Sequence, residues 1–143
     1  MYILKTEHSF DSAHFLSGYK GKCSNIHGHR WKVEVCVQSE TLAKGGQLDG
    51  MIIDFGDLKK DVKSMIDSYD HALIMQEDTM RIETLNCIKQ DGFKVILVDF
   101  RPTAENFASF FFEIMKNKGY DVKRTTVYET PTNSASYEES EVR

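Results

Sequence analysis

Residues 29–38 alternate between two kinds of side chain, and this pattern constrains the fold more than any other feature of the chain. Large apolar side chains occupy one set of positions: Trp31, Val33, Val35 and Val37. Charged or polar side chains occupy most of the positions between them: Arg30, Lys32, Glu34 and Gln38. Because successive side chains of a strand point to opposite faces, the pattern predicts a β-strand with one buried face and one wetter face.

A second stretch, residues 2–16, has the same period of two. Its even positions carry the side chains expected to face the core: Tyr2, Leu4, Phe10, His14 and Leu16. Its odd positions are wetter: Lys5, Glu7, Ser9 and Asp11. Residues 17–25 (SGYKGKCSN) are rich in Gly, Ser and Lys, which is typical of a loop. Two strands joined in this way are most simply an antiparallel pair.

Two helices follow from apolar residues spaced by three and four. The first begins after a capping Asp54 and carries a single apolar stripe: Phe55, Leu58, Val62, Met65, Ile66 and Tyr69. The second begins after Thr103, ends near Gly119 and carries a similar stripe: Phe107, Phe110, Phe111, Ile114 and Met115. Each stripe predicts a helix that packs one face against a sheet.

The remaining elements complete an α+β domain. Residues 94–100 (KVILVDF) are expected to form a short buried strand, residues 122–129 a longer one, and a last strand reaches about Tyr137. Residues 76–92 give no clear pattern. We therefore expect a four-stranded antiparallel sheet with two helices packed on one face, in the order ββααββ with a short extra strand.

Composition excludes several classes of protein. The chain has 143 residues, enough for one domain (1–143), and an acidic segment at about 138–143 is expected to fray. Its net charge of −4 lacks the excess of positive charge that is typical of a protein that binds nucleic acid. No apolar run approaches a membrane span, and the N-terminus, MYILKTEHSF, lacks the apolar stretch of a signal peptide. Three cysteines at unpatterned spacings favour free thiols and a cytoplasmic location.

Three of the five histidines are predicted to meet on the apolar faces of the first two strands. His27 and His29 share the parity of Trp31, and His14 shares the parity of Phe10. A single histidine on an apolar face is ordinarily a satisfied core residue, but each of three convergent imidazoles needs a polar partner. Three imidazoles that converge in apolar surroundings suit zinc, whose tetrahedral geometry would leave one coordination position open.

Cys23 lies four residues before His27, and its role has two interpretations. As a fourth ligand it would close the site into a structural zinc centre. As an uncoordinated thiol beside an open site, it would have a pKa lowered by the cation and could transfer protons. The spacing of the residues does not decide between a structural protein and an enzyme.

Four other polar groups are weaker candidates. An aspartate beside a histidine, as in Asp70-His71, can orient an imidazole for proton transfer, although a histidine at a helix end is also ordinary. Glu105 is an ordinary helix-dipole partner in the first turn after Thr103, and Glu129 is an ordinary solvated carboxylate at a strand end.

Taken together, the motifs resemble the 6-pyruvoyltetrahydropterin synthase superfamily. In chain order they are FDSAH (10–14), CSNIHGH (23–29), DGMIIDFGDLK (49–59), DHAL (70–73), PTAEN (102–106) and VYET (127–130). They cover nearly the whole chain in the family's order. The spacing of three residues between the cysteine and the HGH motif resembles that of the bacterial 6-carboxytetrahydropterin synthases of queuosine biosynthesis.

This resemblance implies a fold, a site and an assembly. The fold is the tunnelling fold, whose subunits join their sheets around a barrel, commonly as a hexamer made of two trimers, with active sites between subunits. By the same resemblance His14, His27 and His29 hold Zn²⁺, Cys23 transfers protons, and Asp70 with His71 forms a second proton relay. Glu129 would anchor the pterin ring, and Thr103 and Glu105 would lie near it.

The implied reaction converts 7,8-dihydroneopterin triphosphate to 6-carboxy-5,6,7,8-tetrahydropterin, releasing acetaldehyde and triphosphate. One alternative is the 6-pyruvoyl product, formed by eliminating triphosphate without carbon–carbon cleavage. Another is a non-catalytic zinc-stabilised binding module. No nucleic-acid or membrane partner is expected.

Overall fold

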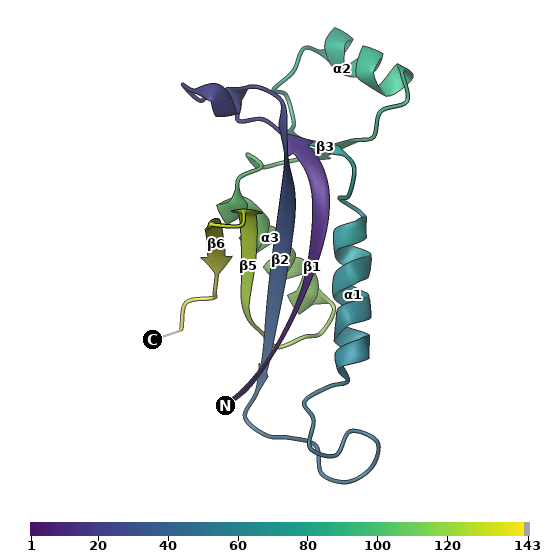
Figure 1. Cartoon of the computed structure of the whole chain (residues 1–143), viewed down its shortest axis with the longest axis vertical. Coiled ribbons are helices and arrows are strands. Elements are labelled where there is room, and N and C mark those ends of the chain that lie inside the picture. Colours follow the sequence, from purple (N-terminus) through teal and green to yellow (C-terminus); the bar gives the residue numbers. More distant parts are fainter. Residues whose placement is uncertain (142–143) are drawn as a thin grey trace.

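The computed structural model describes residues 1–141, so the expected acidic tail lies partly outside the described residues (Figure 1). One 3₁₀ turn (η1, Lys22–Ser24) lies in the loop between the first two strands. The strands are β1 (Tyr2–His14), β2 (His27–Ser39), β3 (Leu73–Gln76), β4 (Val95–Val98), β5 (Val122–Thr130) and β6 (Asn133–Tyr137). The helices are α1 (Phe55–Asp67), α2 (Ile82–Gln90) and α3 (Ala104–Asn117).

The sheet has the strand order β4-β3-β1-β2-β5-β6, and its centre is the expected antiparallel unit. β1 and β2 pair along their whole length, from Tyr2 opposite Ser39 to His14 opposite His27. β5 adds to β2 and β6 adds to β5, both antiparallel. The antiparallel pairing of the first two strands, predicted from their alternating patterns, is therefore confirmed.

The short extra strand expected within 94–100 is present as β4, but β3 was not predicted, and the two extend the expected four-stranded sheet as a parallel pair. β3 and β4 pair in four consecutive positions, but β3 meets β1 only where Leu73 lies opposite Ala13. Four residues are too few for alternation to reveal a strand. The expected burial of KVILVDF is wrong for most of β4, since it lies at the sheet edge and Leu97 is 39% exposed.

The unassigned stretch 76–92 contains α2, a third helix that the sequence pattern did not reveal. α2 lies at one end of the molecule, away from α1 and α3 (Figure 1). Its buried Leu85 packs with Phe15 and Met75 in a small cluster separate from the main core. With one buried side chain, Leu85, in nine residues, α2 has little of the apolar stripe by which α1 and α3 were predicted.

Helices α1 and α3 pack on the same face of the sheet, as predicted. Asp54 caps α1 by accepting a hydrogen bond from the backbone N–H of Gly56 at 2.6 Å, and α3 ends before Gly119, whose φ is +98°. The helices meet the sheet in a core whose largest fully buried side chains include Phe10, Trp31, Leu58, Ile66, Phe107 and Phe111. Among residues 1–141, no helix has both the length and the apolar character needed to cross a membrane.

The opposite face of β1 and β2 has no helix on it and is charged. Arg30 pairs with Asp11 at 3.1 Å across the two strands. Further along, Lys32 lies 3.8 Å from both Glu7 and Glu34. The sheet thus has a helix-covered face, on which the histidines were predicted, and an open polar face.

Candidate metal centre

The antiparallel register of β1 and β2 brings the three histidines together at one end of the strand pair. His14 lies directly opposite His27, and His29 lies opposite Ser12. The ring centroids are 4.6 Å apart for His14 and His27, 5.1 Å for His14 and His29, and 4.8 Å for His27 and His29. One possible ligand atom from each ring lies within 4.8 Å of the others. The convergence expected from strand parity is therefore present.

His14 is the most deeply buried of the three, with 1% of its surface exposed. Its Nδ1 lies 2.7 Å from the carbonyl oxygen of Pro102, just before α3. A backbone carbonyl only accepts hydrogen bonds, so this contact places the ring proton on Nδ1. Nε2 of neutral His14 is consequently left with a free lone pair, as metal coordination requires.

His27 is oriented in the same way by its own loop. Its Nδ1 lies 2.6 Å from the carbonyl oxygen of Asn25, so Nε2 again carries the lone pair. The Nε2 atoms of His14 and His27 are 3.1 Å apart. Two lone pairs at this separation repel each other, and a shared cation would remove the repulsion. A tetrahedral zinc ion with Zn–N bonds of ~2.0–2.1 Å would hold two nitrogens roughly 3.3 Å apart, which is close to this spacing.

His29 supplies the third nitrogen, Nε2, which makes no hydrogen bond within the described part of the chain. Its Nε2 is buried and, within residues 1–141, has no hydrogen-bond partner. The nearest carboxylate oxygen, Oε1 of Glu129, is 3.5 Å away, which is too long for a strong hydrogen bond. A buried polar nitrogen without a partner is costly, and a metal ion would satisfy it.

Burial favours the neutral form of His14 and His29, which is the form that binds metals. Burial lowers the pKa of His14, although the hydrogen bond to Pro102 opposes the shift. Burial also lowers the pKa of His29, against the opposing effect of nearby Glu129. Trp31 packs edge-on against both rings, with centroids 4.9 Å from His14 and 5.4 Å from His29. The aromatic wall excludes water and restricts the rings.

The donor set therefore fits a metal ion. Three neutral imidazole nitrogens converge from two paired strands, two of them fixed in tautomer by carbonyls and the third buried without a partner. Imidazole ligands suit zinc and also copper, iron and nickel, so the donors alone do not select one metal. Three protein ligands leave room for a further ligand, as in catalytic rather than structural zinc sites.

Cys23 lies in η1, in the loop that joins β1 to β2. In the described part of the chain, the group with metal-binding geometry consists of the three histidines and does not include Cys23. The Cys23 side chain is partly buried, and its backbone carbonyl accepts a hydrogen bond from Leu16 N–H at 2.9 Å. Cys23 is therefore not among the described residues that could hold the metal together, and its role as an uncoordinated thiol stays a prediction.

Asp70 and His71 form a preorganised pair beside β1. Nδ1 of His71 lies 2.8 Å from Oδ2 of Asp70, and Oδ1 of Asp70 accepts a hydrogen bond from the backbone N–H of Asp11 at 2.9 Å. That backbone bond, together with His71, lowers the pKa of Asp70. His71 has a φ of +52°, an uncommon conformation for a residue with a side chain. The segment is held in it by a bond from the His71 N–H to the Asp11 carbonyl at 2.6 Å.

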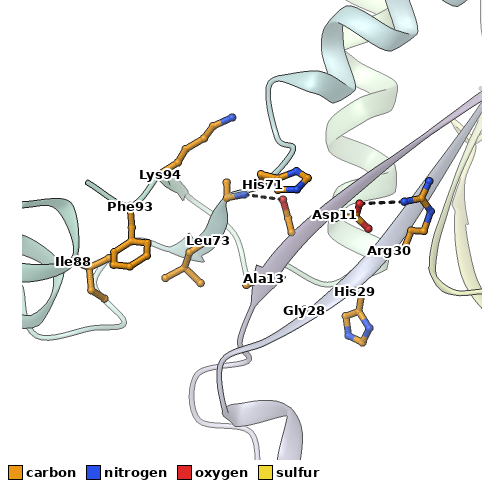
Figure 2. A pocket seen from close by; sticks show the side chains of 12 residues that line it. Asp11, Ala13, Gly28, His29, Arg30, His71, Leu73, Ile88, Phe93 and Lys94 are labelled. Atoms are coloured by element: carbon orange, nitrogen blue, oxygen red, sulfur yellow. Dashed lines mark hydrogen bonds and ion pairs between the residues drawn. The ribbon is translucent and has the colours of Figure 1, made fainter. Parts of the chain in front are cut away.

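The His71 ring does not point toward the metal-site histidines, although His71 and His29 both line one pocket. His71 lines a pocket of about 690 Å³ whose other walls include Arg30, Phe93 and Lys94 (Figure 2). His29 also lines this pocket, but Figure 2 shows its ring pointing away from His71. The side chain of His71 is 78% exposed. Within one chain, the Asp70-His71 pair therefore faces outward.

The other predicted side chains have different positions relative to the histidines. Glu129, near the end of β5, is beside His29 as described above. Thr103 caps α3, its Oγ1 accepting a hydrogen bond from the Asn106 N–H at 3.2 Å. Glu105 is exposed in the first turn of α3, so its ordinary interpretation as a partner of the helix dipole fits the structure.

The sequence reasoning missed the groups that orient the histidines. Two are backbone carbonyls, of Pro102 and Asn25, which no side-chain pattern reveals. The third is Trp31, which was assigned to the core and also forms a wall of the site. One signal was available: PTAEN was noted as a motif, and its proline supplies the carbonyl that fixes His14.

Comparison with known proteins identifies the family. The family model described as 6-pyruvoyl tetrahydropterin synthase matches residues 3–140. A relative in Haemophilus influenzae, named 6-carboxy-5,6,7,8-tetrahydropterin synthase, is 39% identical over 142 residues, covering 97% of this chain and 100% of that protein. A relative of the same name in Aquifex aeolicus is 34% identical, covering 82% of this chain and 76% of its own.

Solved structures agree on the fold. An uncharacterised protein from Wolinella succinogenes superposes with a TM-score of 0.80 at 21% identity, covering 97% of this chain and 98% of that one. The 6-pyruvoyl tetrahydropterin synthase of Plasmodium falciparum superposes with a TM-score of 0.69, also at 21% identity, covering 96% and 97%. The resemblance noted in the sequence motifs is confirmed: the chain belongs to the 6-pyruvoyl tetrahydropterin synthase family.

Proposed function

We propose that this protein converts 7,8-dihydroneopterin triphosphate to 6-carboxy-5,6,7,8-tetrahydropterin, as the names of its relatives in Haemophilus influenzae and Aquifex aeolicus indicate for those proteins. The observation that carries the proposal is the set of three converging imidazoles with a carboxylate, Glu129, 3.5 Å from one of them. A metal centre with a neighbouring carboxylate can bind both ends of a pterin that carries a polar side chain.

We propose zinc as the metal, held by His14, His27 and His29. Three histidines with an open position are the ligand set of a catalytic zinc site. Bound zinc would supply Lewis-acid chemistry to the hydroxyl-bearing side chain of the substrate. The Pro102 and Asn25 carbonyls orient His14 and His27 with Nε2 toward the site, and burial lowers the pKa values of His14 and His29.

Glu129 is proposed to anchor the pterin ring. A pterin edge presents an amino group and ring N–H donors in a row, which a carboxylate can accept as a charge-assisted pair. Its position beside His29 would set the distance between the ring and the metal-binding side chain of the substrate. Thr103 and Glu105, at the start of α3, are proposed to lie near the same ring, with Thr103 also holding the helix cap.

Proton transfer is assigned to Cys23 and to the Asp70-His71 pair. Cys23 lies outside the metal group and keeps its sulfur free for a proton. Asp70 fixes the orientation of His71 by accepting from Nδ1, leaving Nε2 to exchange a proton with substrate. The two groups approach from different elements, as would suit transfers on opposite sides of the substrate side chain.

The outward direction of His71 supports an active site shared between subunits. In one chain His71 lines the pocket with Arg30 and Lys94, and its ring lies away from the His29 ring. We propose that a homo-oligomer, a hexamer built from two trimers, brings the His71 of one subunit to the histidines of another. Both outer strands of the described sheet, β4 and β6, have one unpaired side that assembly could cover.

The atom balance of the proposed reaction defines its test. Cleavage between the first and second side-chain carbons releases two carbons as acetaldehyde, and triphosphate leaves with its bridging oxygen. The carbon that remains on the ring carried one oxygen and ends as a carboxyl, so water must supply the second.

We place this reaction in the cytoplasm, in queuosine biosynthesis.

Purified protein should therefore be incubated with 7,8-dihydroneopterin triphosphate in H₂¹⁸O, and the products analysed by mass spectrometry. We expect acetaldehyde together with a carboxypterin that carries ¹⁸O. Triphosphate release with a three-carbon pyruvoyl side chain would instead identify 6-pyruvoyltetrahydropterin synthase activity. Unchanged substrate with a metal-loaded, folded protein would favour the non-catalytic zinc module.

A further inference from the structure

We propose that Asn106 is a positioning residue for the metal ligand His14, acting through the turn Arg101–Thr103. The inference rests on the metal site of the proposed function and extends it to a residue that would not touch the metal. Asn106 is the third residue of α3 and lies half-buried behind the turn. Its side chain is linked to His14 through one shared stretch of backbone.

The first link is the Pro102 carbonyl, which accepts from Nδ1 of buried His14 at 2.7 Å. The direction of this carbonyl depends on the peptide unit between Pro102 and Thr103. In a trans peptide the C=O and the N–H point in opposite directions. The Thr103 N–H donates to the Arg101 carbonyl at 2.8 Å, so the Pro102 C=O must point away from that carbonyl, toward His14.

The second link is the Arg101 carbonyl itself, which accepts two hydrogen bonds. One comes from the Thr103 N–H, and the other comes from Nδ2 of Asn106 at 2.9 Å. Because a carbonyl only accepts, the contact identifies the amide nitrogen of Asn106 as the atom that faces it. Asn106 thus holds in place the acceptor that determines the orientation of the Pro102 peptide.

This contact differs from ordinary helix capping. A polar side chain at the third helical position normally accepts a hydrogen bond from a backbone N–H at the helix start. Asn106 instead donates to a carbonyl that precedes the helix, and that bond satisfies none of the unpaired N–H groups of α3. The capping role is already filled by Thr103, whose Oγ1 accepts from the Asn106 backbone N–H at 3.2 Å. The side-chain amide therefore serves the turn that faces His14.

The test measures metal affinity rather than activity. Metal-free protein is titrated with Co²⁺, whose visible absorption reports ligand number and geometry, for the natural chain and for Asn106→Asp and Asn106→Ala. Asn106→Asp keeps the shape but replaces the donor with an acceptor facing the Arg101 carbonyl. Loss of a group that orients a metal-binding histidine typically weakens binding about 10–100-fold, and we expect at least about tenfold for each variant, with an altered Co²⁺ spectrum.

Ser109→Ala is the matched control. Its Oγ donates to the Asn106 carbonyl at 3.1 Å, so the variant removes a side-chain-to-backbone bond from the same helix without touching the turn. We expect the Co²⁺ affinity and spectrum of Ser109→Ala to match those of the natural chain. Circular dichroism and melting of the metal-free variants check that the Asn106 variants keep the fold.

Each outcome is decisive. Co²⁺ affinities within about twofold of the natural chain, with the same spectrum, overturn the inference and leave the metal site standing. Loss of helix content in both Asn106 variants, but not in Ser109→Ala, assigns Asn106 to fold stability and also overturns it. Failure of the natural chain itself to bind Co²⁺ removes the metal centre of the proposed function, and this inference with it.

Discussion

Nε2 of His14 and Nε2 of His27 face each other at 3.1 Å, on rings whose Nδ1 atoms both point at backbone carbonyls. The two carbonyls come from distant parts of the chain, Pro102 before α3 and Asn25 before β2. With both protons placed on Nδ1, neither Nε2 can donate to the other. The fold therefore holds two lone pairs in an arrangement that a bound cation stabilises.

The first prediction concerns metal and stability. A ligand that binds only the folded state stabilises it by about 2.7 kcal/mol at a free concentration of 100 Kd. We expect one zinc per chain, and chelation should lower the melting temperature. His27→Ala should hold less than one tenth of the metal at a concentration that saturates the natural chain, since one of three ligands is removed. Elemental analysis and calorimetry measure both quantities, and a full metal complement in His27→Ala would contradict the assigned ligand set.

The second prediction concerns pH and the metal-free protein. Burial lowers the pKa values of His14 and His29 in the folded state below that of an unfolded chain, about 6.5. As the pH falls through that value, the unfolded chain gains protons before the folded one, so stability is lost toward acid. The slope is on the order of 1.4 kcal/mol per pH unit for each such group. Denaturant unfolding between pH 7.5 and 5.0 should therefore show that the free energy of unfolding falls less steeply with pH in His14→Gln than in the natural chain. Identical pH slopes in the two proteins would show that His14 is protonated as readily in the folded state as in the unfolded state.

The convergence of the histidines was predictable because side-chain alternation fixes their face and the short loop between the strands implies that β1 and β2 pair. His27 and His29 lie two apart on a strand, and His14 has the parity of the neighbouring core residue Phe10. The helices α1 and α3 were predictable from their apolar stripes, although Phe55 of the α1 stripe is 61% exposed and Tyr69 lies beyond the helix end. In both cases a local period and the existence of one core fix the direction of the side chains.

The remaining features depend on contacts between distant segments. β3 pairs with β1 at a single position, and its four residues are too short to show a period. The Pro102 carbonyl reaches His14 across 88 positions of sequence, through a backbone atom that every residue possesses. The outward direction of His71 follows from its positive φ, from the bond of its N–H to the Asp11 carbonyl, and from the bond of the Asp11 N–H to the Asp70 carboxylate. These contacts join distant segments, so no local side-chain pattern reveals them.

The third prediction separates the two roles considered for Cys23. Since Cys23 is not part of the metal-binding group among the described residues, Cys23→Ala should keep its zinc and its melting temperature. Turnover should fall by about 10²-fold or more, the usual cost of losing a general acid or base. Metal content, melting and steady-state rates of the same preparation decide the point. Loss of zinc together with unfolding would restore the structural fourth-ligand interpretation.

The fourth prediction distinguishes two carboxylates at the site. Glu129→Gln removes the charge that the pterin donors would face beside His29, so KM for the dihydropterin substrate should rise by about tenfold or more, since a charged hydrogen bond contributes about 1.5–3 kcal/mol. Glu105 is exposed at the start of α3, so Glu105→Gln should raise KM less than Glu129→Gln does. Metal content should be unchanged in both variants. A larger effect in Glu105→Gln would transfer the anchoring role to α3.

The last prediction tests whether one active site draws on two chains. His71 faces outward, with 78% of its side chain exposed, while the metal histidines lie on the helix-covered face of the same sheet. His27→Ala and His71→Ala should each be inactive alone. If a site combines His27 of one subunit with His71 of another, random co-assembly of equal amounts restores both groups to about one quarter of the sites. Activity near that fraction after mixed refolding, and absent after mixing without subunit exchange, supports sharing. A mixture that stays inactive despite confirmed exchange would require both groups to act within one chain, through a movement that turns His71 toward the metal face.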